Sequence, residues 1–252
     1  GEFGHLAAPY FECIRIRMQP HLFLKQDRES ELYILLKNLD IDLLIVYGLW
    51  IPLFPILDDF AFKKIILFRQ YEDWWFSLET KKHGKLVFDP AQYDCSISIE
   101  PNFFRKGWSS INPVIIRNRD EILDRESARK ALGAETGCKV CVLAHNGKKG
   151  ELAALETKIE NIRQDREFQV IVATNRNEQS LFPLADYFNG IDLIIGGAGY
   201  NLFYETRYLG VNAHFFPQKR KNEDQLWRMQ TNSTYTFRQN GSDQLVDIIE
   251  NL

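Results

Sequence analysis

Apolar residues in the second half of the chain form short continuous runs, and stretches with helical spacing separate these runs. The runs cover 140–144, 168–173, 191–195 and 211–216, and the helical stretches cover 151–163, 181–188 and the residues between Gly199 and Gly210. Strands buried on both faces of a parallel sheet are apolar throughout, whereas strands with one solvated face alternate. The pattern therefore predicts an α/β fold in which helices connect parallel strands.

The first half shows the same alternation with more aromatic residues. Strands are predicted at 21–24, 42–47, 64–68 and 96–100, and helices at 29–39 and 51–62, the second with Pro52 and Pro55 near its start. A strand-like segment, 113–118, then leads into the charged helical segment 119–134, whose Ile122, Leu123 and Leu132 are expected to dock on a sheet. This change of composition predicts two Rossmann-like domains, 1–115 and 116–252, with a cleft between them.

The stretch from Ile191 to Arg228 organises the second domain. An apolar strand ends in a turn that contains Gly196, Gly197 and Gly199, and the following helix ends at Gly210. Such a turn leaves backbone N–H groups free at the positive end of the helix, which suits a phosphate group. Asn201 and Glu205 are four residues apart and therefore share one helix face. The spacing predicts a phosphate site with a carboxylate in reach of a ribose diol.

Two other loops are expected at the same sheet edge, where ligands of open α/β folds bind. Asn146 and Gly147 follow the strand 140–144, with Lys148 and Lys149 next to them as possible phosphate contacts, although a plain polar turn is an equal alternative. The strand end at Thr174–Arg176 is a weaker candidate for the edge of a nucleotide base. Asp224 and Gln225 arrive from the loop after the strand 211–216.

The segment Arg69–Phe76 contains the aromatic residues Tyr71, Trp74 and Trp75 directly after a predicted strand. Bulky aromatic side chains belong to cores first, so we interpret them as core residues or as a hydrophobic lid. The alternative is an acceptor cleft in which they stack on a sugar or cover a lipid tail.

Composition excludes several classes of protein. The chain has 252 residues, 45% of them hydrophobic, and a formal net charge of −3, which argues against a nucleic-acid partner. Four Cys without a paired framework suit a reducing cytoplasm, and Cys138 and Cys141 lack the second pair that a zinc site needs. No metal and no cofactor is expected. No apolar run is long enough to span a membrane, and no signal peptide opens the chain.

The motif G-A-G-Y-N-x-x-x-E, followed by G-V, F-P-Q and D-Q, resembles the donor-binding half of the GT-B glycosyltransferases that use nucleotide sugars. The resemblance extends to the type that adds N-acetylglucosamine in peptidoglycan-precursor synthesis. It implies that Gly197, Gly199 and Asn201 hold the pyrophosphate, with Tyr200 between them in the donor site. It also implies that Glu205 holds the ribose and that Asp224 and Gln225 hold the sugar. Gly197 and Leu202 stand where small-molecule enzymes have His and Ser, so backbone N–H groups would bind more of the phosphate.

The first residues, GEFGH with Pro9 soon after, resemble the first glycine loop of the same enzymes. The resemblance implies that His5 is the general base or an acceptor contact, although a lone His near an N-terminus is more often solvated. The apolar strand that precedes this loop in the family is missing. Either the first strand has been lost from the sequence or Gly-Glu-Phe is the remnant of an expression tag.

The expected function is transfer of a sugar from a nucleotide diphosphate, implied to be UDP, to a hydroxyl of a small-molecule or lipid-linked acceptor. The resemblance implies inversion without a metal, in the cytoplasm, with peripheral membrane contact as an option. Alternatives are a UDP-sugar epimerase or hydrolase, and a non-catalytic subunit that keeps the fold. A dinucleotide site is a further alternative, but Leu202 stands where its third glycine belongs. A turn without any ligand is the simplest alternative.

Overall fold

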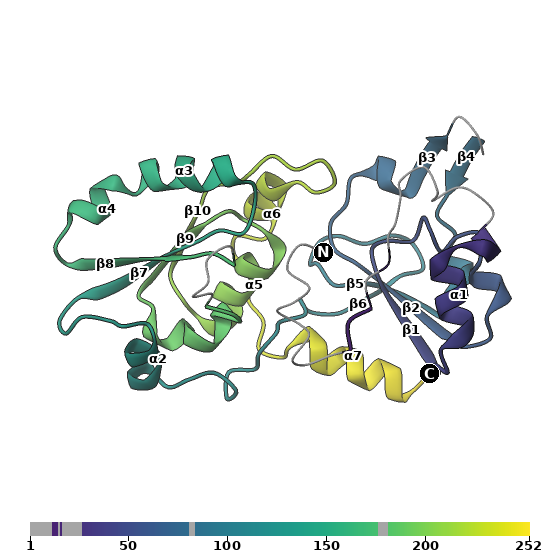
Figure 1. The fold of residues 1–252 in the computed structure, drawn as a ribbon, viewed down its shortest axis with the longest axis horizontal. Coiled ribbons are helices and arrows are strands. Elements are labelled where there is room, and N and C mark those ends of the chain that lie inside the picture. Colours follow the sequence, from purple (N-terminus) through teal and green to yellow (C-terminus); the bar gives the residue numbers. More distant parts are fainter. Residues whose placement is uncertain (1–11, 15, 17–26, 81–83, 176–180) are drawn as a thin grey trace. The chain divides into compact units, whose positions relative to one another are not determined.

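The structure is a computed structural model that describes residues 12–14, 16, 27–80, 84–175 and 181–252 (Figure 1). Two compact units divide the chain: one comprises Gly1–Asn112 and Leu245–Leu252, and the other comprises Pro113–Gln244. This division falls after Asn112 and again after Gln244, and the domains expected from the sequence are 1–115 and 116–252. His5 and the predicted strand 21–24 lie outside the described residues.

The first unit contains a four-stranded parallel sheet in the order β1-β2-β5-β6 and a separate antiparallel hairpin, β3-β4. Its strands are β1 (Leu43–Tyr47), β2 (Lys63–Phe68), β3 (Ser77–Thr80), β4 (Gly84–Val87), β5 (Cys95–Ser98) and β6 (Ser109–Ser110). The helix α1 (Glu31–Asn38) begins after Ser30, whose hydroxyl accepts a hydrogen bond from the N–H of Tyr33. The 3₁₀-helices are η2 (Asp27–Glu29), η3 (Leu57–Asp59), η4 (Asp73–Phe76) and η5 (Pro90–Gln92).

The second unit contains a four-stranded parallel sheet in the order β10-β9-β7-β8. Its strands are β7 (Lys139–Ala144), β8 (Phe168–Ala173), β9 (Leu193–Gly196) and β10 (Ala213–Phe215). The helices are α2 (Arg125–Ala131), α3 (Lys149–Lys158), α4 (Glu160–Gln164), η6 (Leu184–Gly190), α5 (Tyr200–Leu209), α6 (Gln225–Thr231) and α7 (Gly241–Glu250), the last of which crosses the division between the units. The α/β class and the parallel pairing predicted from the apolar runs are confirmed.

The central strand β7 shows why this sheet needs helices on both faces. Val140, Val142 and Ala144 belong to one hydrophobic cluster, and Cys141 and Leu143 belong to another. Alternate residues of a strand point to opposite faces, so an entirely apolar strand must be covered twice. In Figure 1, α3 and α4 cover one face of this sheet, and α2 and α5 lie on the other.

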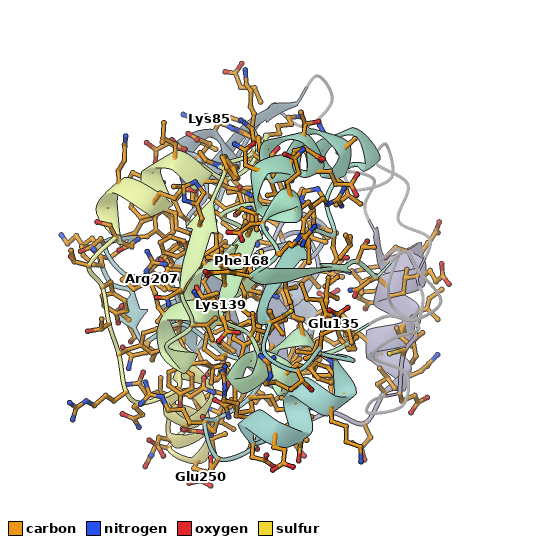
Figure 2. The ribbon with its side chains drawn as sticks, turned by 90° about the vertical axis from the view of Figure 1, so that its left-hand side faces the viewer. Lys85, Glu135, Lys139, Phe168, Arg207 and Glu250 are labelled. Carbon is orange, nitrogen blue, oxygen red and sulfur yellow. The ribbon has the colours of Figure 1, made fainter. Side chains whose placement is uncertain are left out.

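The amino-terminal edge of the same sheet is an ordinary solvated surface. Lys139, the first residue of β7, forms an exposed ion pair of 3.0 Å with Glu167. Its ammonium group lies 5.6 Å from the ring centroid of Phe168, the first residue of β8 (Figure 2). The glycine turn and the polar loops that the sequence singled out follow the strands at the opposite, carboxyl-terminal edge.

Several predicted elements differ from the observed ones. The helix expected over 51–62 is wrong: this segment forms turns and the short helix η3. Pro55 lacks the N–H group that would bond to the carbonyl of Ile51, and it disfavours a helical conformation at Phe54. The predicted helix 151–163 is divided into α3 and α4 at Ile159.

Three further differences concern extended or short segments. The predicted helix 181–188 is instead the 3₁₀-helix η6, which starts after Pro183. The strand-like segment 113–118 is in no strand, because its backbone bonds to Asn240 and Gly241 instead of to a sheet. The hairpin β3-β4 was not predicted. Ile122 and Leu132 do pack against the sheet cluster as expected, whereas Leu123 is 38% exposed.

The aromatic segment of the first unit is mainly part of its core, as we interpreted it. Tyr71 is buried and stacks on Trp75 with 5.3 Å between ring centroids. The indole N–H of Trp75 donates to the carbonyl of Gly48, and that of Trp50 donates to the carbonyl of Trp75. Trp74 is the exception, with 37% of its surface exposed.

Candidate functional site

The carboxyl ends of the second sheet bring the sequence candidates to one edge. Ala144 of β7 is in register with Gly196 of β9, and Phe215 of β10 is also in register with Gly196. The loops that follow these strands are therefore neighbours: residues 145–148, the glycine turn 197–199, and the loop 216–224. Open parallel sheets bind ligands at this edge because the helices that follow the strands direct their N-termini to it.

The glycine turn leads directly into α5 without a side-chain cap. Gly199 is the N-cap residue, with φ −63° and ψ 150°, and it has no side chain that could accept from the first helical N–H groups. At Gly196 a Cβ atom would lie 2.6 Å from the carbonyl oxygen of Ala144 and 2.7 Å from Leu202 Cδ2, so only glycine fits between β7 and α5. Gly210 ends the helix in the left-handed conformation, at φ +77°, as its place in the sequence predicted.

Gln225 lies against this turn. A Cβ atom at Gly197 would be 3.5 Å from Gln225 Oε1, and one at Gly199 would be 4.0 Å from Gln225 Nε2. Gln225 is 4% exposed, and its Oε1 accepts a hydrogen bond of 2.8 Å from the backbone N–H of Gln218. The structure thus places Gly197, Gly199 and Gln225 together, although they are far apart in the sequence.

A buried ion pair behind Gln225 fixes the turn to α6. Arg228 is fully buried; it donates to the carbonyl of Ala198 at 2.8 Å and to Glu223 Oε2 at 3.0 Å. Gln225 Nε2 donates to the other oxygen of Glu223 at 3.3 Å. A paired, hydrogen-bonded arginine in a dry interior holds its neighbours in one geometry. The sequence analysis missed this network, and the close spacing of Glu223, Gln225 and Arg228 was the only available signal.

Glu205 lies one helical turn beyond Asn201 and is partly buried. Burial raises the pKa of its carboxyl to about 7, because desolvation disfavours the charged form. No described residue donates a hydrogen bond to this carboxyl. Arg207 lies over the ring of Phe203 at 3.5 Å and donates to backbone carbonyls, and Arg228 pairs with Glu223. Among the described residues, neither arginine therefore pairs with Glu205.

The other three donor-site candidates on α5 and α6, Asn201, Tyr200 and Asp224, differ in exposure and in hydrogen bonding. Asn201 is exposed in the first turn of α5. Tyr200 is buried, and its hydroxyl accepts a hydrogen bond of 2.9 Å from the N–H of Val114, so its side chain is directed to the segment before α2. Asp224 is the N-cap of α6 and accepts from the N–H groups of Leu226 and Trp227. Its carboxylate already has a role in the fold.

The loop after β7 is more constrained than its composition suggested. Asn146 accepts a hydrogen bond of 2.5 Å from the N–H of Asn175, which ties the ends of β7 and β8 together. A Cβ atom at Gly147 would lie 2.4 Å from Glu151 Oε2, 2.7 Å from His145 Nε2 and 2.8 Å from Arg220 Nη2. A side chain at position 147 would therefore displace the ends of these three side chains, and the side chain of Lys148 is exposed.

A cluster of His145, Glu151 and Arg220 surrounds Gly147, and the sequence analysis missed it. Arg220 makes two hydrogen bonds to Glu151, of 2.5 and 2.8 Å, and they hold the pKa of Glu151 below its usual value. His145 is 7% exposed, and burial lowers its pKa. Its Nε2 lies 3.2 Å from Glu151 Oε2 without the geometry of a hydrogen bond. The cluster therefore joins the segment after β7 to the loop after β10 through an ion pair.

Among the described residues, no group of three His, Cys, Asp or Glu side chains is arranged to hold a metal ion. In the same part of the chain, no helix is long and apolar enough to cross a membrane.

Comparison with known proteins identifies the fold. No protein-family model matches the sequence, and no curated protein sequence does. Among solved structures, MurG of Acinetobacter baumannii matches with a TM-score of 0.53 and 14% identity, over 98% of this chain and 78% of its own. The glycotransferase of kitacinnamycin matches with a TM-score of 0.53 and 12% identity, over 88% of this chain and 69% of its own. The chain therefore has the fold of the GT-B glycosyltransferases, as its glycine-turn motif predicted.

Proposed function

We propose that the protein is a glycosyltransferase that binds a nucleotide-diphosphate sugar at the carboxyl edge of the second sheet. The observation that carries the proposal is the pairing of two features on α5. Its N-terminus follows a glycine turn without a side-chain cap, and Glu205, one turn farther, has no described hydrogen-bond donor. A diphosphate at the first feature and a ribose diol at the second would satisfy both.

In this proposal the chain's own groups stabilise the leaving nucleotide diphosphate. The N–H groups at the start of α5 and the positive end of its dipole face the developing charge. Gln225 and Asp224 bind sugar hydroxyls from the adjacent loop. His5 removes the proton of the acceptor hydroxyl, and attack from the opposite side of the sugar gives inversion without a metal. The uridine base and these last steps rest on the motif resemblance.

A thermal-shift series on the full chain with UDP, GDP and dTDP tests the donor site. Ligand binding raises the melting temperature in proportion to RT ln(1 + [L]/Kd), so UDP should give the largest shift. Glu160→Gln changes an exposed carboxylate on α4, away from the proposed site. As a control, this variant should show the same increase in melting temperature with UDP as wild type. If no nucleotide diphosphate raises the melting temperature at millimolar concentration, the donor site is refuted.

A second experiment follows the sugar. With a radiolabelled UDP-sugar and a panel of hydroxyl acceptors, the label should move to an acceptor. Label released to water would assign hydrolysis, and binding without turnover would assign a non-catalytic subunit.

A further inference from the structure

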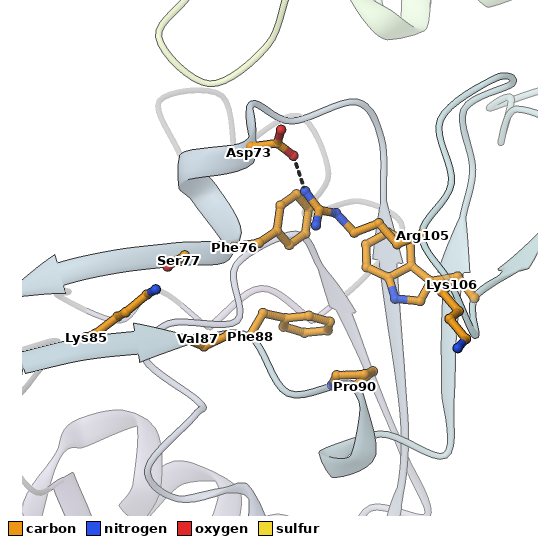
Figure 3. Close-up of a pocket in the computed structure, with 10 residues that line it drawn as sticks. Asp73, Phe76, Ser77, Lys85, Val87, Phe88, Pro90, Arg105 and Lys106 are labelled. Carbon is orange, nitrogen blue, oxygen red and sulfur yellow. Dashed lines mark hydrogen bonds and ion pairs between the residues drawn. The ribbon is translucent and has the colours of Figure 1, made fainter.

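The first unit contains an open pocket of about 640 Å³ that the proposed donor site does not use. Its walls come from η4 and the start of β3, from β4 with Phe88 and Pro90, and from the segment Arg105–Trp108 (Figure 3). All of these segments belong to the first unit. The volume is within the range of small-molecule sites, which are mostly apolar with a few placed polar groups.

Aromatic rings form the apolar part of this pocket. Trp108 lies edge to face with Phe88, at 5.9 Å between centroids, and with Phe76, at 5.7 Å. Phe76 and Phe88 are nearly buried, so they form a fixed floor, whereas Val87 is 50% exposed at the wall. These rings and Val87 give the pocket an apolar surface against which a flat apolar group can pack.

The polar part of the pocket is cationic. Three cationic side chains, Lys85, Arg105 and Lys106, line it against one carboxylate, that of Asp73. Figure 3 shows Lys85 and Lys106 on opposite sides of the pocket. Neither lysine has a partner among the described residues. Both lysines are exposed, and together with Arg105 they give the pocket two positive charges more than its single carboxylate balances.

Arg105 adds an independent observation. Its guanidinium lies 3.9 Å from the centroid of Phe76 and pairs with Asp73, whose side chain is 98% exposed. Its Nε is buried and has no hydrogen-bond partner in the described part of the chain. Arg105 therefore adds an unsatisfied N–H donor to the cationic residues that line the pocket.

We propose that this pocket binds a small organic anion that combines a flat apolar ring with a carboxylate or phosphate group. The ring packs against the apolar residues of the pocket, such as Trp108 and Val87, and the anionic group lies between Lys85 and Lys106. The site is separate from the proposed donor site and does not depend on it.

Calorimetric titration of the full chain with matched probes tests this site. 1-Naphthyl phosphate and 1-naphthoate carry a ring and an anion, 1-naphthol lacks the charge, and inorganic phosphate lacks the ring. Binding of one molecule of 1-naphthyl phosphate or 1-naphthoate is expected, at least about tenfold tighter than 1-naphthol or inorganic phosphate. The better of the two anions identifies the anionic group. Equal affinity for 1-naphthol, or no binding of either anion at millimolar concentration, overturns the proposal.

Variants assign the binding to this pocket. Lys85→Gln and Lys106→Gln should each weaken 1-naphthyl phosphate or 1-naphthoate by about three- to tenfold, while Lys37→Gln, an exposed lysine on α1, should change nothing. Val87→Asp places a negative charge at the exposed wall and should abolish binding, whereas Val87→Thr should preserve it. Excess UDP should leave the affinity unchanged. Displacement by UDP, or wild-type affinity in both lysine variants, would show that the probe binds elsewhere.

Discussion

A glycine follows a strand of the parallel sheet in each unit, and the two glycines have opposite surroundings. Gly48 follows β1 with φ +65°, and a Cβ atom there would lie 2.3 Å from the hydroxyl of Tyr71. Gly199 lies at the end of the turn after β9, and the nearest atom to its Cβ position is Gln225 Nε2, at 4.0 Å. The first glycine is covered by aromatic side chains, and the second adjoins open space and an amide.

The comparison shows that a glycine after a strand can serve either the packing of the core or access to a helix N-terminus. In the first unit glycine allows the chain's own side chains, Tyr71 and Trp75, to close the sheet edge. In the second unit it keeps the start of a helix accessible to a ligand. Substitutions that add one methyl group at each position therefore separate a packing role from a binding role.

The largest expected effect is on stability, at Gly48. Gly48→Ala forces a left-handed backbone on a residue with a side chain and displaces Tyr71. We expect a loss of about 2–4 kcal/mol in the free energy of unfolding. Denaturant unfolding measures it, with Gly107→Ala as a control that has the same type of backbone strain, at φ +83°, and no atom within 4 Å of its Cβ position. If both variants lose the same free energy of unfolding, packing of Tyr71 against Gly48 does not contribute to the loss.

Gly199→Ala should behave in the opposite way. The backbone angles at Gly199 suit alanine and the Cβ position is open, so stability should change by less than about 1 kcal/mol. The added methyl group stands beside Gln225, where we propose that the diphosphate binds, and UDP affinity should fall about tenfold. Calorimetric titration measures the affinity. Unchanged UDP binding would mean that this turn serves the fold alone, as Gly48 does.

Asp224 tests whether a residue at the binding edge serves the fold, the ligand or both. Asp224→Ala removes the N-cap of α6 and should cost about 1 kcal/mol of stability, whereas Asp224→Asn keeps the cap. If the carboxylate also binds a sugar hydroxyl, the Asn variant should lose UDP-sugar turnover at unchanged melting temperature. Full turnover in the Asn variant would restrict Asp224 to capping.

A pH dependence of stability is expected at Glu205. Its carboxyl has a pKa of about 7 in the folded chain against 4.5 for the free group, so the folded state binds more protons between these values. Stability is therefore lost as the pH rises through this window and is constant above it. Glu205→Gln should melt progressively higher than wild type as the pH rises from about 4.5 to about 7. A pH-independent difference would mean that burial does not perturb Glu205.

The sequence predicted the second unit better than the first. Its apolar strands, the glycine turn, and the length of α5 up to Gly210 follow from local rules of period and capping. The helix predicted over 51–62 was wrong because tertiary packing and Pro55 overrode the helical spacing of apolar residues. Trp50, Ile56 and Leu57 are buried in the core, but they lie in turns and a short 3₁₀-helix.

The positions of candidate residues were predicted only where they follow from local spacing. Glu205, Gly197 and Gly199 are set by a single strand, turn and helix. The contact of Gln225 with the turn, the buried Arg228–Glu223 pair and the cluster around Gly147 depend on which loops the sheet order brings together. Sequence periodicity does not contain that information. The pocket beside β4 was missed for the same reason, because its aromatic and cationic residues come from three separate segments.

The most direct test of the account is the interaction between Glu205 and a ribose hydroxyl. Dissociation constants of UDP and 2′-deoxy-UDP are measured for wild type and Glu205→Gln at a pH above 7, where the carboxyl is charged. A charged acceptor for two hydroxyls is worth roughly 1.5–3 kcal/mol, so the substitution should weaken UDP about tenfold or more and weaken 2′-deoxy-UDP much less. The same small change for both ligands would contradict the account, since Glu205 would then lie outside the nucleotide site.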